Sequence, residues 1–527
     1  MNKSTEPKKK NLLKSGMIVS ASTFLSRILG LIRDVIIADL LGASLAADVF
    51  FFANRIPNFF RRLFADGAFN QAFVPILAEY NAKDHKTCRD FIGLVTGTMG
   101  LVITVITVIG VLGSSIVAAV FGWGWYMDSF KSDAGAEKFA LASLLLKITF
   151  PYLWFVTITA IFGAVLNTNK KFAIPALSPC LLNISVISCA LLLSPHLQQP
   201  AVGLAVGIFL GGLTQLLFQI PFIINLKLLG IPKFNWHHEG IVKIRKLMLP
   251  AIFGISVDQI NLLITTTLAS FLATGALSYL YYSERIIEFP LGMFAVAIST
   301  VILPSLSRGN VSNDLNKFNR TMDWGVRMVL LLGIPAVFGI IVLRHLIIAT
   351  IFMRGEFSPD DVVKSAASLF ACSIGLLSYM LVKVFAPAFY AKQDTKTPVK
   401  CAVIAVLSNI FFNLALVYPL DYIGLALSTT LSGTINMLLL ARGLYRRNIY
   451  HIPRETYVYA FKLLIGSIAM SAAILLLQPD IETITAYSNM QRCIWLGGLI
   501  ALGGAVYFAV SMICGIRKTD LRVNEEL

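Results

Sequence analysis

Charged side chains interrupt an apolar stretch near the start of the chain, FLSRILGLIRDVIIADLL at residues 24–41. On insertion scales a charge at the centre of a bilayer costs about 2.5–3.5 kcal/mol, so such residues usually face a partner or a hydrated cavity. Arg27 and Asp34 share one stripe of a helix because they stand seven residues apart. Arg33 lies about 120° from Arg27 around the same helix and need not face the same cavity.

A second set of polar side chains follows in DVFFFANRIPNFFRR. Asp48, Arg55 and Arg62 recur every seven residues and predict one polar helix face, with Asn58 three residues after Arg55. Arg61 and Arg62 lie near the expected end of this helix. They either bind a ligand or extend to the lipid headgroups.

A third charged pair, Arg285 and Glu288, stands in the apolar segment SERIIEFP. With a rise of 1.5 Å per residue, Arg27, Arg55 and Arg285 each fall about 15 Å from the end at which their segment enters the membrane, near its middle. We expect these guanidinium groups to line one hydrated cavity and bind an anion, because their planar fork suits phosphate oxygens. The alternative is that Arg27–Asp34 and Arg285–Glu288 are structural ion pairs.

Asp258, in GISVDQINLLI, is a lone carboxylate in another apolar segment. It is either a cation or proton site, with Asp394 as a distant partner, or a polar residue of helix packing. The seven cysteines are scattered without CxxC or Cys/His spacing, so neither a metal site nor a disulfide framework is predicted. We expect no cofactor; Na⁺ or proton coupling stays open.

The composition assigns these segments to a membrane. The chain is 57% hydrophobic and 14% charged, with mean hydropathy +0.76, whereas soluble domains are about a quarter charged. We predict an all-α polytopic protein with fourteen spans of about 20 residues each, near 17–40, 46–64, 92–119, 139–166, 172–194, 201–226, 247–273, 275–306, 325–349, 365–390, 398–418, 422–446, 457–477 and 493–515.

Basic residues set the expected orientation. About 32 of the 44 Lys and Arg fall on loops of the N-terminal side, which predicts that both termini are cytoplasmic. This asymmetry also explains the net charge of +16, so we expect no nucleic-acid partner. The chain has no P-loop, HExxH or GxSxG motif and no loop long enough for a catalytic domain, which favours a transporter over an enzyme.

The two halves of the chain resemble each other. Arg55 matches Arg285, and Pro75 and Pro175 match Pro304 and Pro398, at nearly constant offset. The copies lie an even number of spans apart, which predicts two six-helix lobes related by a pseudo-two-fold axis along the membrane normal, plus two C-terminal spans. The expected parts are a basic cytoplasmic tail, an N-lobe, a cytoplasmic linker, a C-lobe, and a C-terminal part with two spans and a tail (1–16, 17–226, 227–246, 247–446 and 447–527).

Several motifs resemble one known family. SRILGLIRD and ANRIPNFFRRLFADGAFNQAFVPILAEY are similar to the signature of the MurJ/MviN lipid II flippases, as are LLKITFPY, YYSERIIEFPLGMFAVAISTVILPSLSR and KVFAPAFYAKQDTKTPVK. The resemblance covers both lobes and the extra spans. It implies a fourteen-span exporter of the multidrug/oligosaccharidyl-lipid/polysaccharide superfamily. Such a protein would move lipid II, an undecaprenyl-pyrophosphate-linked disaccharide-peptide, across the bacterial cytoplasmic membrane by alternating access.

The same resemblance assigns residues. The family's functional arginines match Arg27, Arg33, Arg61 with its neighbour Arg62, and Arg285, and its other polar positions match Asp34, Asp48 and Asn58. Some members bind sodium through a seventh-span residue similar in position to Asp258. The expected partners are lipid II, membrane lipids and cell-wall synthesis proteins.

Two other functions stay open. One is a cation-coupled exporter of drugs or of another polyprenyl-linked glycan, although a drug exporter would want acidic groups in the cavity. The other is a non-transporting scaffold for cell-wall enzymes, which has no need of arginines in the middle of the membrane.

Overall fold

The computed structural model describes residues 8–63, 68–311 and 314–516, and these residues form helices and no strand. This confirms the all-α class. The chain divides into two compact units, Met1–Gly275 and Ala276–Leu527, called here the N-terminal and C-terminal units. Each is described by itself.

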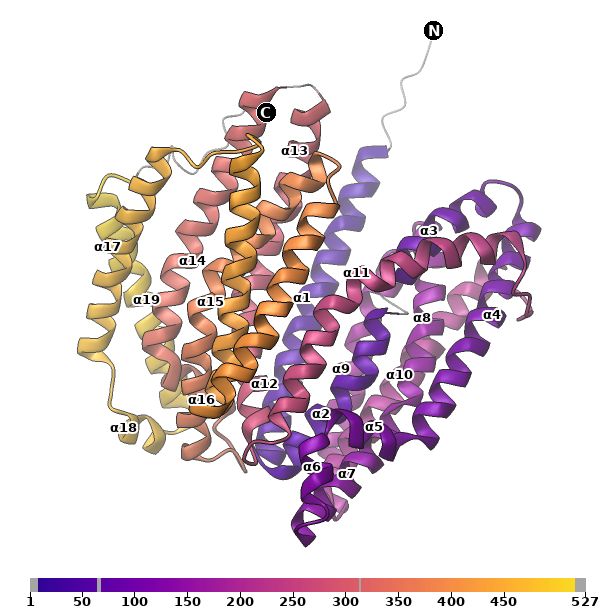
Figure 1. Ribbon diagram of the computed structural model, residues 1–527, viewed down its shortest axis with the longest axis horizontal. Coiled ribbons are helices and arrows are strands. Elements are labelled where there is room, and N and C mark those ends of the chain that lie inside the picture. The colour runs from indigo at the N-terminus through magenta and orange to yellow at the C-terminus, as the bar shows by residue number, and fades with distance from the viewer. Residues whose placement is uncertain (1–7, 64–67, 312–313, 517–527) are drawn as a thin grey trace. The chain divides into compact units, whose positions relative to one another are not determined.

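The helices of the N-terminal unit form two packed groups (Figure 1). α1 lies against α9, and α10 lies between α8 and α9. A second cluster of buried aromatic and aliphatic side chains joins α3, α4 and α8, with Tyr80 stacked on Phe91 at 3.9 Å between ring centroids. The helices are α1 (Lys8–Leu41), α2 (Leu45–Arg61), α3 (Ala68–Asn81), α4 (His85–Leu112), α5 (Ser114–Phe121), α6 (Trp123–Asp128), α7 (Asp133–Thr149), α8 (Pro151–Thr168), α9 (Ala173–Leu192), η2 (Ser194–His196), α10 (Pro200–Asn225) and α11 (Glu239–Ala269).

Local chemistry sets several of these boundaries. Ser44 begins α2 and Asp84 begins α4, each with a side chain that accepts a hydrogen bond from a backbone N–H of the first turn. Pro151 separates α7 from α8, because its ring has no N–H to donate and is best placed at a helix start. The span predicted at 139–166 is therefore made of two helices.

An extended segment after α10 lies against α4. Lys233 N donates to Gly93 O at 3.2 Å. A Cβ atom at Gly97 would lie 2.3 Å from Lys233 O, so the approach requires glycine there.

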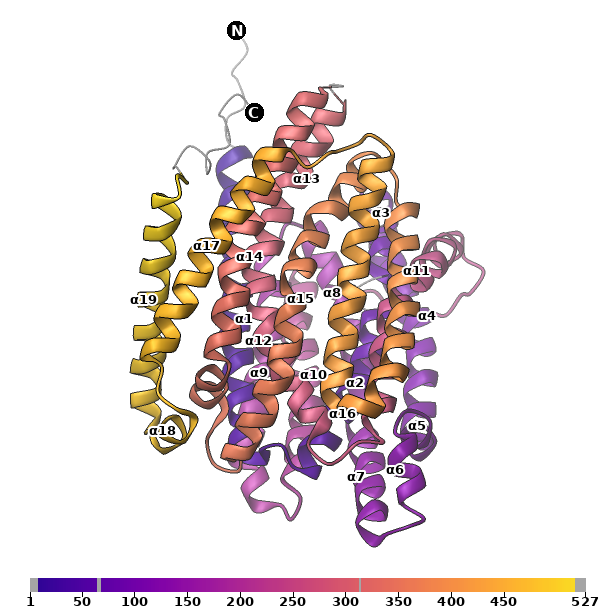
Figure 2. The same cartoon turned by 60° about the vertical axis from the view of Figure 1, so that its left-hand side comes forward.

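The C-terminal unit is built on long helices (Figures 1 and 2). α14 contacts α15, α17 and α19, and α17 and α19 form a hairpin through α18. Capping boxes begin α15 at Ser358 and α19 at Ser488. The helices are α12 (Ala276–Pro290), a π-helical turn η3 (Leu291–Ala295), α13 (Val296–Val311), α14 (Leu315–Phe352), α15 (Pro359–Ala391), α16 (Lys396–Arg446), α17 (Arg454–Leu477), α18 (Ile481–Ala486) and α19 (Asn489–Ile513).

α16 contains two of the predicted spans, 398–418 and 422–446. They meet at Asp421, whose backbone angles (φ 53°, ψ −140°) are not helical. Pro419 precedes this residue, and Gly424 approaches the backbone of Leu416 so closely that an added Cβ would lie 2.2 Å from its carbonyl oxygen. The chain therefore reverses direction within a very short connection.

Ten helices of the described residues are long and apolar enough to cross a membrane. They include neither α1, α2 nor α11, which coincide with three further predicted spans, and α16 accounts for two predicted spans as one helix. These differences account for the gap between the ten helices found and the fourteen spans expected. The count of fourteen, the two-lobe symmetry and the orientation of the termini stay predictions.

α11 belongs to the N-terminal compact unit, because it packs on α3 and also contacts α2, α5 and α6. The predicted boundaries of the lobes and of the linker 227–246 stay predictions. The predicted tail at 1–16 is helical from Lys8 onward. Its first seven residues, and residues 517–527 of the C-terminal tail, lie outside the described part.

Candidate functional site

The polar face of α2 lies against α11. Arg55 is buried and its Nη1 donates to Thr266 Oγ1 at 3.0 Å. Seven residues after Arg55, the exposed Arg62 donates from Nη1 to Gln259 Oε1 at 3.4 Å. Positions rise along α2 as they fall along α11, so the two helices are antiparallel. The seven-residue spacing therefore does place these arginines on one face, and that face is a helix contact.

Asp48, at the start of the same face, binds the backbone of the segment that follows α11. Gly275 N donates to Asp48 Oδ2 at 2.7 Å, and Lys138 Nζ of α7 lies 3.8 Å from the same oxygen. Lys138 Nζ also lies 4.8 Å from the ring centroid of Trp125. The Lys138 and Asp48 side chains are 9% and 3% exposed, so each charge compensates for the burial of the other. The sequence did not indicate Lys138, which stands just before the span predicted at 139–166.

Asp34 of α1 forms an ion pair with Arg33 rather than with Arg27. Arg33 donates from Nε and Nη2 to Asp34 Oδ1 at 3.0 and 2.7 Å, and from Nη1 to Asn183 Oδ1 of α9 at 3.1 Å. Asn183 Nδ2 in turn donates to Ser26 O at 3.1 Å. The Asp34 side chain is fully buried. The Arg27–Asp34 ion pair, given above as the alternative to anion binding, is not formed, because Asn183 orients the Arg33 guanidinium toward the neighbouring carboxylate.

Arg27 is exposed on α1 and forms no hydrogen bond or ion pair with the residues that the structure describes. Its positive charge is therefore available to a ligand or to the membrane surface. Arg33 is part of the packing between α1 and α9. The two arginines of one motif thus differ in what surrounds them.

Asn58 and Arg61 form a short ladder along α2. Arg61 Nε donates to Asn58 Oδ1 at 3.0 Å, and Asn58 Nδ2 donates to Asn54 O and Oδ1 at 2.8 and 2.9 Å. This ladder fixes the direction of the Arg61 guanidinium, which is half-buried.

In the C-terminal unit, Arg285 pairs with Glu288 within α12. Arg285 Nη1 lies 3.1 Å from Glu288 Oε2, and the two side chains are 27% and 61% exposed. This ion pair is the one given above as the alternative to anion binding, and the role of Arg285 and Glu288 in substrate binding stays a prediction. An exposed pair of this kind contributes about 0–1 kcal/mol, so an anionic ligand can displace Glu288 at little cost. That Arg27, Arg55 and Arg285 line one cavity stays a prediction.

The two proposed cation residues are placed unequally. Asp258 lies in α11, but its side chain is outside the described part. Asp394 precedes α16, where Thr397 donates to it from N at 3.0 Å and from Oγ1 at 2.6 Å, and where it forms an ion pair with Arg447. The hydroxyl of Thr397, its backbone N–H and the Arg447 guanidinium together hold the pKa of Asp394 below its ordinary value. Within the described residues, no group of three or more His, Cys, Asp or Glu side chains is arranged to hold a metal.

Comparison with known proteins decides the family. A family model described as lipid II flippase MurJ matches residues 37–492. The chain belongs to the lipid II flippase MurJ family. A relative from Vibrio cholerae, named probable lipid II flippase MurJ, is 53% identical and covers 98% of this chain and 99% of its own length. One from Burkholderia cenocepacia, named lipid II flippase MurJ, is 35% identical over 97% of this chain and 99% of its own length.

Solved structures agree with this family. A lipid II flippase MurJ in an inward closed conformation matches with TM-score 0.78 and 30% identity, over 94% of this chain and 98% of its own. An inward-facing multidrug resistance MATE family transporter of the MOP superfamily matches with TM-score 0.66 and 12% identity, over 82% and 98% of the two chains. The second match shows the fold alone. The MurJ resemblance of the sequence motifs is confirmed.

Proposed function

We propose that the protein is a lipid II flippase, which moves the pyrophosphate-linked precursor from the inner to the outer leaflet of the bacterial cytoplasmic membrane. The observation that carries this proposal is the match of nearly the whole chain to a relative named probable lipid II flippase MurJ. The MurJ family model covers residues 37–492, which hold Arg55, Arg61, Arg62 and Arg285. The protein is therefore a transporter rather than an enzyme. Its many apolar helices support a multi-pass membrane location, with both termini in the cytoplasm from the distribution of basic loops.

Arg27 and Arg285 are the best candidates to bind the pyrophosphate. Arg27 is exposed and forms no hydrogen bond or ion pair in the described part of the chain. Arg285 is half-buried, and its ion pair with Glu288 is partly exposed to solvent. A guanidinium group binds phosphate oxygens through two parallel N–H donors, which gives both charge and geometry. The isoprenoid tail of the substrate would remain in lipid.

Arg33, Arg55 and Asp48 have a different proposed role. Each is held by a buried neighbour from another helix, at Asn183, Thr266 and Lys138 respectively. They position the helices that carry the binding groups. Arg61, Arg62 and Asn58 lie at the end of α2 and would meet the substrate before Arg27 does, since the proposed orientation places that end on the cytoplasmic side. Cation coupling through Asp258 remains part of the proposal.

Depletion and replacement test the proposal. In a bacterium depleted of its own lipid II flippase, expression of this chain should restore growth and make newly made lipid II accessible to a membrane-impermeant hydrolase. If the chain restored only the transport of another polyprenyl-linked glycan, the exporter alternative would be supported. A chain that inserts into the membrane without changing the accessibility of lipid II would contradict the proposal.

A further inference from the structure

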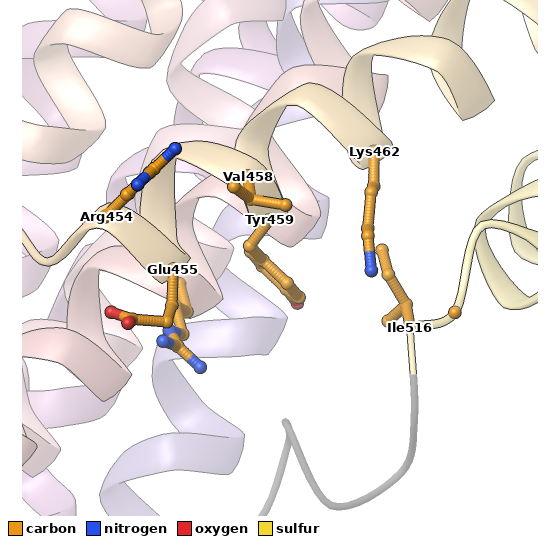
Figure 3. A pocket seen from close by; sticks show the side chains of 8 residues that line it. Arg454, Glu455, Val458, Tyr459, Lys462 and Ile516 are labelled. Carbon is orange, nitrogen blue, oxygen red and sulfur yellow. The ribbon is translucent and has the colours of Figure 1, made fainter.

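A basic pocket lies in the C-terminal unit where α14, the start of α17 and the end of α19 meet (Figure 3). Its volume is about 370 Å³, at the small end of the range for ligand sites. The residues that matter to its chemistry are Arg327, Arg454, Glu455, Tyr459 and Lys462. None of these residues belongs to the arginine motifs described above.

The pocket carries excess positive charge. It is lined by three basic side chains and one carboxylate, and within the described residues none of the three forms an ion pair. Asp323 interacts electrostatically with Arg327 from outside the lining, but its carboxylate also accepts a hydrogen bond from the Tyr450 hydroxyl. Counting Asp323 as well as Glu455, the neighbourhood still keeps one uncompensated positive charge.

One of the three basic groups, Arg327, is held in place by its neighbours. Arg327 Nε donates to Thr456 Oγ1 at 3.1 Å, and its guanidinium carbon lies 5.7 Å from the ring centroid of Tyr459. These contacts orient the Arg327 guanidinium through its Nε atom. Figure 3 shows Tyr459 between Glu455 and Lys462, with Lys462 extending toward Ile516. The planar guanidinium of Arg327 and the ammonium group of Lys462 line the same pocket, and both groups are suited to bind phosphate.

The surroundings favour a lipid as the source of that phosphate. Exposed apolar side chains flank the pocket on α17 and α19, including Val458, Phe461 and Ile513. The pocket opens at the end of the C-terminal hairpin where α17 begins, which the proposed orientation makes cytoplasmic. Basic pockets between membrane helices on that side are suited to anionic lipid headgroups.

We propose that this pocket binds the phosphate of an anionic phospholipid of the cytoplasmic leaflet, with the acyl chains along the exposed faces of α17 and α19. The bound lipid would join the C-terminal hairpin to α14. The pocket uses none of the residues proposed to bind the pyrophosphate, so its test does not depend on transport.

Native mass spectrometry of the full-length protein in detergent tests this proposal, with phosphatidylglycerol as the probe. Arg327→Gln combined with Lys462→Gln should weaken binding of the first phosphatidylglycerol by about tenfold, because two charge-assisted contacts are lost. Arg442→Gln combined with Arg446→Gln removes the same charge from exposed positions near the end of α16 and should leave binding unchanged. Equal weakening in both double variants would overturn the site.

Glu455→Gln gives a result of opposite sign, which cannot arise from misfolding. Removing this carboxylate should tighten phosphatidylglycerol binding severalfold, since it opposes the phosphate. Phosphatidylcholine should bind weakly to every variant, and millimolar inorganic phosphate should not displace phosphatidylglycerol. If inorganic phosphate alone binds at this site, or if Glu455→Gln weakens lipid binding, the assignment to a phospholipid is wrong.

Discussion

Lys138 Nζ lies 3.8 Å from Asp48 Oδ2, and the Lys138 and Asp48 side chains are 9% and 3% exposed. This pair joins α7 to α2 while Gly275 donates to the same Asp48 oxygen. Two buried charges of opposite sign stabilise one another, and removal of either leaves the other without compensation. The pair therefore predicts a strong effect of single substitutions.

Lys138→Met should lower the free energy of unfolding by about 3–5 kcal/mol, because the buried Asp48 carboxylate loses its lysine counter-charge. Asp48→Asn combined with Lys138→Met should restore much of this loss, since both charges are gone. Melting temperatures of the detergent-solubilised variants measure both effects. Lys131→Met is the matched control, because its pair with Asp128 is 3.7 Å long but exposed. A loss of equal size in the control would contradict the assignment.

Arg27 and Arg33 should respond differently to truncation. Arg27→Ala should greatly slow lipid II transport with little change in melting temperature, because the side chain is exposed and forms no hydrogen bond or ion pair within the described residues. Arg33→Ala should lower the melting temperature as well, because it leaves the buried Asp34 carboxylate without its guanidinium. Arg27→Lys should also lose transport, since an ammonium group cannot form the bidentate contact. Normal transport by both Arg27 variants would remove this residue from the binding site.

A double substitution tests whether Arg27 and Arg285 bind the same pyrophosphate. If Arg27 and Arg285 bind one pyrophosphate, Arg27→Ala and Arg285→Ala should be strongly non-additive in the rate of transport. Glu288→Gln should keep transport, because the exposed Glu288 competes with the substrate for Arg285. The measurement is the rate at which lipid II becomes accessible outside, compared across the two single variants and the double variant. Strictly additive losses would assign the two arginines to different steps.

Gly97 tests the packing of the segment after α10 on α4. Gly97→Ala should destabilise the protein by about 1–3 kcal/mol, because the new Cβ would lie 2.3 Å from Lys233 O, a backbone atom that cannot turn aside. Gly498→Ala is the control, since a Cβ there meets nothing within 4 Å and alanine favours a helix. It should leave the melting temperature unchanged or raise it slightly.

Asp394 predicts a dependence of stability on acid pH. Hydrogen bonds from Thr397 and the Arg447 guanidinium lower the pKa of Asp394 in the folded protein. Its contribution to stability is therefore complete above the unfolded pKa of Asp, near 4, and is lost as pH falls through the lower folded value. Asp394→Asn should reduce the melting temperature at pH 7, and the difference from the unsubstituted protein should shrink below pH 4. A difference that stays constant down to pH 3 would contradict this linkage.

Features that depend on neighbouring residues could be predicted from the sequence alone. The apolar segments are helices because their composition and length allow little else in a membrane. The face shared by Arg55 and Arg62 follows from the helical repeat, and the Arg285–Glu288 pair follows from a separation of three residues. The family was also evident, because motifs such as SRILGLIRD are contiguous in the chain.

Only the tertiary structure decided which partner each charge has. Arg33 binds Asp34 because Asn183, 150 positions away, orients it, and Arg55 contacts Thr266 across 211 positions. Lys138 had no sequence signal, since its role depends on α7 packing beside α2. Helix periodicity specifies the direction of a side chain from its own axis, whereas the residue that it meets depends on which helices pack together. The basic pocket between α14, α17 and α19 has the same origin, because no local pattern connects Arg327 with Lys462.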